Sequence, residues 1–333
     1  MTIRYVLPAG ALVLSIFFAL SSGSVAIPFM DVIQSLFVCP FSAPCGVSEL
    51  SDQILWEIRL PRVLMALVTG AGLAVTGAVL QSIMRNPLAD PYLFGISSGA
   101  SLGAVIVLSS TMAVAGVSLT LGALLGGLFS VVLMLTLAGR SATNVERLLL
   151  SGVAVSFMLS SFTGLILYYS DPDTAASLLF WMMGSFSNSQ WSELPVPAIA
   201  LVVGVFLFVS FRRWFSAVLA GDESAFALGV PVNRFRLSML LVCAAITAVI
   251  VAHVGGIGFV GLMIPHISRY LVGARIQDLV PMCLLIGGIF MIWVDVVAHS
   301  LLAYQVLPVG IVTSAAGSLF FFFILKFRTY SSG

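Results

Sequence analysis

The chain has 333 residues, of which 60% are apolar and only 8% carry a formal charge. Soluble domains carry about 25% charged residues, so this composition excludes a protein whose whole surface faces water. The net charge is +1 and the chain contains no basic run, which excludes nucleic acid as a partner. A transmembrane helix takes about 20 residues, so we expect an all-α protein of about ten spans, folded as one polytopic domain over residues 1–333.

The N-terminal region leaves two alternatives open. Arg4 is followed by an apolar run to Leu20 and then by small residues, a pattern typical of a signal peptide and also of a first span. Because the later spans need an orientation, we favour a retained span in contact with membrane lipid. Further on, Cys39 and Cys45 lie in a proline-containing loop. They would form a disulfide in an oxidising compartment, and the alternative is two free thiols.

Apolar runs bounded by turn residues predict spans at 4–20, 62–83, 94–111, 115–138, 148–169, 194–212, 237–254, 258–268, 281–303 and 308–326. The eighth run is too short to cross as a straight helix, and it follows Gly255, Gly256 and Gly258. We expect a broken helix here, which a membrane tolerates only where protein or a water-filled cavity covers the freed backbone. This break is a candidate element of a transport pathway.

Small residues recur at helix-contact spacing in two of these spans. Gly99 is followed by Gly103, and Gly122 by Gly126. Such pairs let helices approach closely, so they indicate packing and not function.

Basic residues orient the spans. With a cytoplasmic N-terminus, every lysine and arginine except Arg59 and Arg62 falls inside, as the positive-inside rule requires. Both termini are then cytoplasmic, and the loops at about 21–58 and 171–193 are external. The longest inside segment, about 213–236, contains Asp222 and Glu223 and suits a short helix with acidic residues in its first turn.

Two motifs suggest other classes of protein. The run Gly95–Gly99 fits the nucleophile motif G-x-S-x-G around Ser97, but that motif carries chemistry only on a strand-turn-helix. Asp295 is the single acidic residue deep in a span, with His299 one helical turn later. Such a pair would suit a proton-coupled carrier, which is the second candidate function.

ATP chemistry is not expected in this chain. It lacks the phosphate-binding run G-x-x-x-x-G-K-[ST], so any ATP and Mg²⁺ would be bound by separate subunits. No pair of histidines or carboxylates has the spacing of metal ligands on one helix face. We therefore expect no cofactor, no metal and no catalytic residue here.

Six motifs, in order, resemble the FecCD-type permeases of ABC importers, which take up ferric siderophores, haem or cobalamin across the bacterial inner membrane. They are Arg59-Leu60-Pro61-Arg62, Arg85-Asn86-Pro87-Leu88-Ala89-Asp90-Pro91, Arg147-Leu148-Leu149-Leu150-Ser151-Gly152, Trp181-Met182-Met183-Gly184-Ser185, the run from Gly258 to His266, and Leu307-Pro308-Val309-Gly310. The resemblance implies a multi-pass subunit that pairs with a second permease subunit, identical or paralogous. It also implies two cytoplasmic ATP-binding subunits and a periplasmic substrate-binding protein. A ferric siderophore is the commonest cargo of the family, and haem or cobalamin is the alternative.

The resemblance also implies roles for individual residues. The segment that couples to the ATPase maps to Gly221, Asp222, Glu223, Ser224, Ala225, Leu228 and Gly229. The cytoplasmic gate maps to Asn86, Pro87 and Leu88, and the docking positions for the binding protein map to Arg59, Arg62 and His299, which replaces a family arginine. Pathway candidates are Trp181, Met182, Met183, Gly258, Phe259, Pro265 and Asp295. The family's terminal Gly-Ala-Pro reads Gly317-Ser318-Leu319, so the last helix is expected to lack a proline bend.

Overall fold

The computed structural model describes residues 3–23, 25–39, 46–110, 117–139, 145–302 and 305–330, and every regular element within these ranges is a helix. Each predicted span corresponds to a helix, which confirms the all-α class and the expected number of spans. These helices are α1 (Ile3–Ser21), α4 (Leu60–Met84), α5 (Ile96–Ser109), α6 (Leu119–Ala138), α7 (Val145–Tyr169), α9 (Pro195–Ser210), α12 (Val232–Val254), α13 (Val260–Val272), α14 (Ile276–Ser300) and α15 (Val309–Tyr330).

The helices differ in how they can cross a bilayer. Six helical segments of the described chain are long and apolar enough to span it alone: those containing α1, α4, α6, α7, α12 and α14. Helix α9 continues through a 62° bend into α10 (Arg212–Leu219). Helix α13 has only 13 residues, which confirms the expected short helix after the glycine break. The remaining elements are α2 (Phe29–Phe37), α3 (Glu49–Gln53), the π-helix η1 (Ile54–Arg59), the 3-10 helix η2 (Pro91–Phe94), α8 (Pro172–Met182) and α11 (Asp222–Ala227).

The second span begins earlier than predicted. Helical structure runs without a break from Glu49 to Met84, whereas the sequence pattern placed the start of this span at residue 62. The π-helical turn η1 ends two residues before Pro61, which lies in the first turn of α4. A proline has no backbone N–H to donate to the preceding helical turn. The wider π turn accommodates this missing hydrogen bond, so the helix continues.

Helix α4 is the buried centre of the bundle. A Cβ on Gly70 would lie 2.1 Å from the carbonyl oxygen of Gly287 in α14. A Cβ on Gly77 would lie 2.0 Å from that of Gly261 in α13. The backbones of neighbouring helices therefore touch α4 directly, as small residues allow in membranes.

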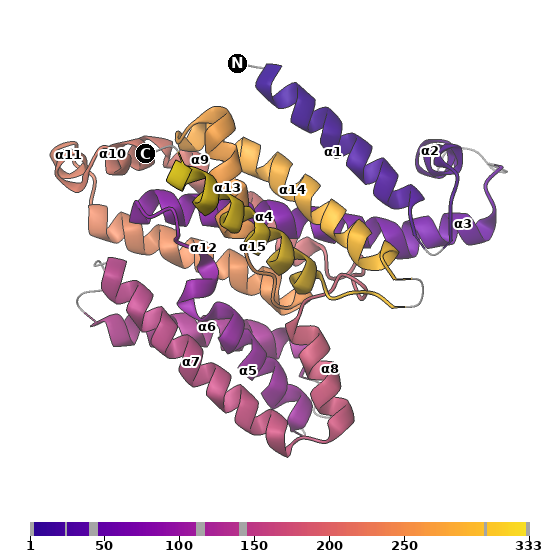
Figure 1. Cartoon of the computed structure of the whole chain (residues 1–333), viewed down its shortest axis with the longest axis horizontal. Helices are drawn as coiled ribbons and strands as arrows, with labels where there is room; N and C mark the ends of the chain where they lie inside the picture. The colour runs from indigo at the N-terminus through magenta and orange to yellow at the C-terminus, as the bar shows by residue number, and fades with distance from the viewer. Residues whose placement is uncertain are drawn as a thin grey trace.

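Helices α5 to α8 form a second group, which lies at the lower side of Figure 1. Within it, a Cβ on Gly103 would lie 2.0 Å from the carbonyl oxygen of Gly122, and one on Gly99 would lie 2.3 Å from that of Gly126. The predicted packing glycines of α5 thus meet those of α6.

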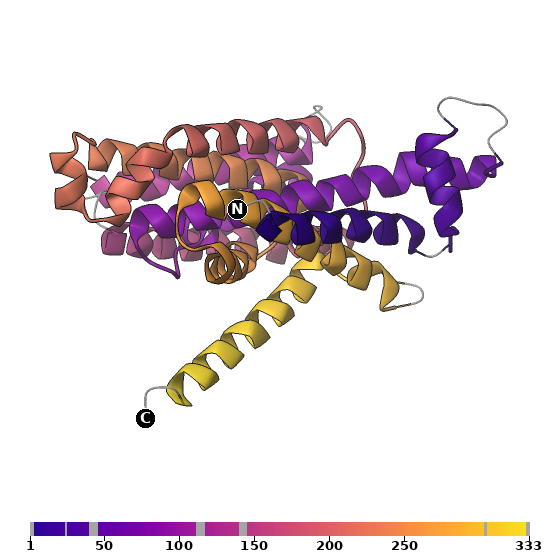
Figure 2. The same cartoon turned by 90° about the horizontal axis from the view of Figure 1, so that it is seen from above.

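Helix α15 projects away from the rest of the bundle, as Figure 2 shows. It is continuous from Val309 to Tyr330, in agreement with the missing proline. Phe322 and Phe323 near its end are 60% and 51% exposed. Such an exposed apolar helix face suits a contact with lipid or with another membrane subunit.

Contacts between distant segments agree with the predicted two ends of the bundle. At the cytoplasmic end, the Tyr5 hydroxyl donates to the carbonyl of Asp278, 3.2 Å away. At the outer end, Nη1 of Arg59 donates to the carbonyl of Leu20, 2.6 Å away. Residues that the charge bias assigned to one side of the membrane therefore lie together.

Candidate functional site

Three separated segments meet at the glycine break after α12. The backbone N–H of Ser185 donates to the carbonyl of Val254 over 2.9 Å, and the N–H of Gly310 donates to the carbonyl of Met183 over 2.9 Å. A Cβ on Gly255 would lie 2.1 Å from the carbonyl oxygen of Trp181. The structure thus brings the predicted pathway segment 181–183 against the break and against the start of α15.

Phe259 connects the break to α15. It adopts a left-handed conformation with φ 68° immediately before α13, which is uncommon for a residue other than glycine. Its Cβ would lie 2.4 Å from a Cβ added to Gly317 of α15, and its ring centroid lies 6.4 Å from that of Phe321. Unusual backbone conformations concentrate at functional sites. Pro265, another pathway candidate, is buried within α13.

Ser97 lies beside this region, but not in a hydrolase site. It is in the first turn of α5, which follows the 3-10 helix η2 and Gly95. A nucleophile elbow requires a strand before the turn, and the part of the chain that the structure describes contains none. The Tyr92 hydroxyl accepts a hydrogen bond from the N–H of Ile257, so this corner of the bundle anchors the glycine break.

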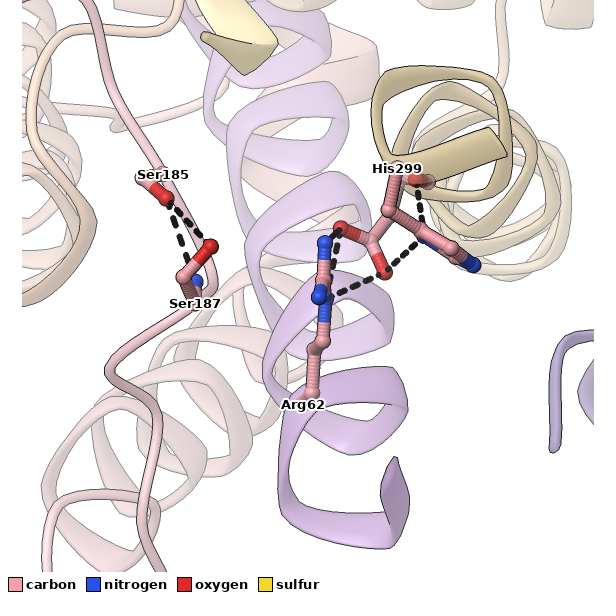
Figure 3. Close-up of polar contacts among 5 residues, drawn as sticks. Arg62, Ser185, Ser187 and His299 are labelled. Atoms are coloured by element: carbon pink, nitrogen blue, oxygen red, sulfur yellow. Dashed lines mark hydrogen bonds and ion pairs between the residues drawn. The ribbon is translucent and has the colours of Figure 1, made fainter. Parts of the chain in front are cut away.

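At the outer end, Asp295 is paired with Arg62 (Figure 3). Nη2 of Arg62 lies 2.8 Å from Oδ1 of the carboxylate, and Nε lies 2.9 Å from Oδ2. The His299 Nδ1 atom lies 2.6 Å from the carbonyl oxygen of Asp295 and 3.7 Å from its Oδ2. The Arg62 guanidinium accounts for a carboxylate buried at 2% exposure. The structure therefore places Asp295 in an ion pair with Arg62, in the wall of a cavity that His299 also lines.

The two arginines predicted as docking positions are more buried than cations of an external loop usually are. Arg59 is 8% exposed and donates hydrogen bonds to the main-chain carbonyls of Leu20 and Val25. Arg62 is 17% exposed. Arg59, Arg62 and His299 nevertheless all line one cavity of about 230 Å³ that opens at this end. A partner would meet these groups by inserting a side chain, and not across a flat charged surface.

At the cytoplasmic end, an ion-pair network joins the predicted coupling segment to the predicted gate. Asp222, the first residue of α11, accepts from Nη2 of Arg85 at 2.8 Å and from Nη2 of Arg236 at 3.2 Å. Arg85 immediately precedes the gate residues, and Asn86 Oδ1 accepts from the backbone N–H of Leu88 at 2.9 Å. Arg85 and Asp222 are each close to half-exposed, whereas the side chain of Arg236 is buried.

Helix α11 presents an apolar tip. Ala225 is buried, whereas Phe226 is 79% and Leu228 is 72% exposed. Phe226 was missed by the sequence interpretation, although it is the one aromatic residue within the predicted coupling segment from Gly221 to Gly229. Exposed aromatic side chains of this kind serve as anchors in protein interfaces.

The comparisons with known proteins decide the family. The FecCD transport family matches residues 11–327. The chain belongs to the FecCD transport family. It is a permease subunit of an ABC importer, and the ATPase of such a system resides in separate subunits.

Individual relatives resemble the permease over most of its length. It is 38% identical to the cobalamin import system permease protein BtuC of Halobacterium salinarum, over 86% of this chain and 78% of the relative. It is 37% identical to the hemin transport system permease protein HmuU of Yersinia pestis, over 88% and 93%. The solved structure of a transporter assigned to the metal-chelate type, in an inward-facing conformation, matches with a TM-score of 0.84 at 31% identity over 98% and 99%.

Membership of an ABC importer family contradicts the second candidate function, a proton-coupled carrier.

The predicted disulfide is only partly within the described residues. Cys39 is disulfide-bonded, and Cys45, its predicted partner, lies outside them. Cys243 and Cys283 are buried free thiols.

Further polar groups at the cytoplasmic end were not singled out from the sequence. Nη1 of Arg269 donates to the Gln81 amide oxygen at 2.6 Å, and the Gln81 amide donates to the carbonyl of Gly261 at 2.9 Å. Asp90 is 3% exposed, and its Oδ1 accepts from the N–H of Tyr92 at 2.7 Å. Burial raises the pKa of Asp90 to about 6.

Proposed function

We propose that the permease moves a ferric siderophore across a bacterial inner membrane, from a periplasmic binding protein, driven by two cytoplasmic ATP-binding subunits. The observation that carries the proposal is the link between the exposed tip of α11 and the gate loop at Asn86–Leu88, through Asp222 and Arg85. A motion imposed on α11 from outside the chain would act on the end of α4. The permease therefore needs no energy source of its own.

The cargo is inferred from the residues that surround the glycine break and from the similarity to a solved transporter structure. The segments around the glycine break contribute Trp181, Met182 and Met183, each partly exposed, and backbone groups of glycine. Such a surface suits a large chelate whose specific contacts are made by the binding protein. The match to a metal-chelate-type transporter over nearly the whole chain favours a ferric chelate. Haem and cobalamin are the alternatives.

Partner surfaces support the assembly. Phe226 and Leu228 provide apolar anchors for an ATP-binding subunit. The exposed face of α15 and the 59% exposed Leu88 suit a second permease subunit, a copy or a paralogue. At the outer end, a carboxylate of the binding protein inserted in the cavity beside Arg62 would meet a guanidinium and His299.

The test is reconstitution. The permease, its ATP-binding subunit and its binding protein are placed in proteoliposomes, and uptake of an iron-labelled siderophore, haem or cobalamin is measured with and without ATP. The proposal expects ATP-dependent uptake of the siderophore alone. Uptake of haem or cobalamin in its place would correct the cargo, and uptake without the ATP-binding subunit would overturn the driving force.

A further inference from the structure

The position of Asp222 links two elements with different predicted roles. It begins α11, and its N-cap residue Gly221 has φ 124°, so the helix starts with a sharp change of chain direction. The carboxylate receives hydrogen bonds from two guanidinium groups that belong to two other helices, Arg85 at the end of α4 and Arg236 in α12. The carboxylate of Asp222 therefore connects α11 to the end of α4 and to α12.

Arg85 fixes the start of the gate loop. It is the C-cap of α4 and adopts a left-handed conformation with φ 50°. The next residue, Asn86, donates its N–H to the carbonyl of Gln81 at 3.2 Å and binds the N–H of Leu88 with its side chain. Because these contacts follow one another along the chain, a displacement of Arg85 must change the position of Leu88 or break a hydrogen bond.

Arg236 provides the second connection and is much better buried. Its side chain is 7% exposed, its Nε donates to the carbonyl of Ile83 at 3.0 Å, and its Nη2 reaches Asp222. A guanidinium is a planar group with fixed donor directions. Binding the last turn of α4 with one nitrogen and α11 with another therefore sets the distance between these two helices.

From this geometry we propose that Asp222 is a positioning residue that transmits the movement of α11 to the gate loop through Arg85 and Arg236. The inference rests on the proposed function, since it assumes an ATP-binding subunit acting on α11. It goes further by assigning transmission to three named side chains. Asp222 does not touch the substrate in this assignment.

The exposure of the pair between Arg85 and Asp222 favours a role in transmitting movement over a role in stabilising the fold. Arg85 and Asp222 are 43% and 45% exposed. A single ion pair of such exposure contributes little to folding stability. In Asp222→Asn the amide oxygen can still accept from the buried Arg236, which also keeps its hydrogen bond to the carbonyl of Ile83. This variant is therefore expected to leave the assembled transporter intact, while weakening the connection between α11 and the gate loop.

The experiment compares Asp222→Asn, Arg85→Ala and the double variant in the reconstituted complete transporter. The quantity measured is substrate taken up per ATP hydrolysed, together with the amount of ATP-binding subunit that co-purifies. We expect each single variant to lower the ratio about five-fold with unchanged co-purification. The double variant should be no worse than Asp222→Asn, because the pair between Arg85 and Asp222 is already lost in each single variant. Asp278→Asn and Arg275→Ala, which change charges at the same end of the bundle outside this network, are the matched controls and should keep the ratio.

The possible outcomes separate the two proposals. If the wild-type complex shows no ATP-dependent uptake, the proposed function fails. If the wild type transports and either single variant keeps its ratio, the assignment to Asp222 is overturned. Losses that multiply in the double variant, or a loss of the ATP-binding subunit from purified Asp222→Asn, would likewise overturn it and indicate independent or docking roles.

Discussion

Nη2 of Arg62 lies 2.8 Å from Oδ1 of Asp295, and this pair joins the start of α4 to the last turns of α14 at the outer end of the permease. Asp295 is 2% exposed, and the guanidinium of Arg62 is the cation that pairs with its carboxylate. Removing one partner of a buried pair leaves the other uncompensated, which typically costs about 3 kcal/mol or more.

The pair leads to a stability prediction. Asp295→Asn should lower the free energy of unfolding by about 3 kcal/mol, measured by thermal unfolding in detergent. The double variant Arg62→Met/Asp295→Leu should recover most of this loss, because apolar side chains of similar volume leave no buried charge. A double variant as unstable as the single would show that the pair is needed for more than charge balance.

Crossing glycines give a second prediction. In Gly103→Ala the new Cβ would lie 2.0 Å from the carbonyl oxygen of Gly122, so α5 and α6 must separate. We expect a loss of about 2 kcal/mol in thermal unfolding. Gly164→Ala in α7 is the matched control, because nothing lies within 4 Å of its Cβ, and it should melt at or above the wild-type temperature.

A third prediction concerns pH. Burial raises the pKa of Asp90 from 3.8 to about 6. Because its pKa is raised in the folded protein, the protonated carboxyl group stabilises the folded state. This stabilisation is fully present below pH 3.8 and is lost as the pH rises through about 6. The permease should therefore be more stable at pH 4.5 than at pH 7.5 by roughly 2 kcal/mol from this group.

Asp90→Asn should remove that part of the pH dependence and stabilise the protein at neutral pH, since the amide oxygen can still accept from Tyr92. The measurement is the melting temperature across this pH range. Asp171→Asn is the contrast. This exposed carboxylate caps α8, and hydrogen bonds from the side chain and the backbone N–H of Thr174 lower its pKa, so its neutralisation should give no gain at neutral pH. A wild-type pH profile retained in Asp90→Asn would contradict the prediction.

The apolar tip of α11 yields a fourth prediction. Phe226 is 79% exposed, and its truncation should remove an anchor of the ATP-binding subunit. Phe226→Ala should weaken co-purification of that subunit about tenfold or more, as interface hot spots do. Phe180→Ala, a change of a 62% exposed phenylalanine at the outer end, serves as the control and should co-purify normally. Equal recovery of both would exclude α11 as the docking element.

Much of the fold could be predicted from the sequence. The predicted spans coincide with helices, including the short helix after Gly255–Gly258, because partition into lipid depends on the summed hydropathy of consecutive residues. The second span was predicted to start at residue 62, because the helix before it carries charged residues, and only the structure shows that it continues back through the π turn to Glu49. The family resemblance predicted a gate and a coupling segment but gave no relation between them.

The sequence by itself determined that this is a polytopic bundle, how it is oriented and which segments interrupt it, since these properties follow from local runs of apolar and basic residues. Only the tertiary structure decided that Arg62 neutralises Asp295, and that Asp222 is shared by Arg85 and Arg236. Arg62 and Asp295, like Arg85 and Asp222, are more than a hundred residues apart in the chain, and their pairing depends on which helix backbones approach closely. That choice is made by packing at positions such as Gly70 and Gly77 of α4, where the absence of a side chain allows helices to touch.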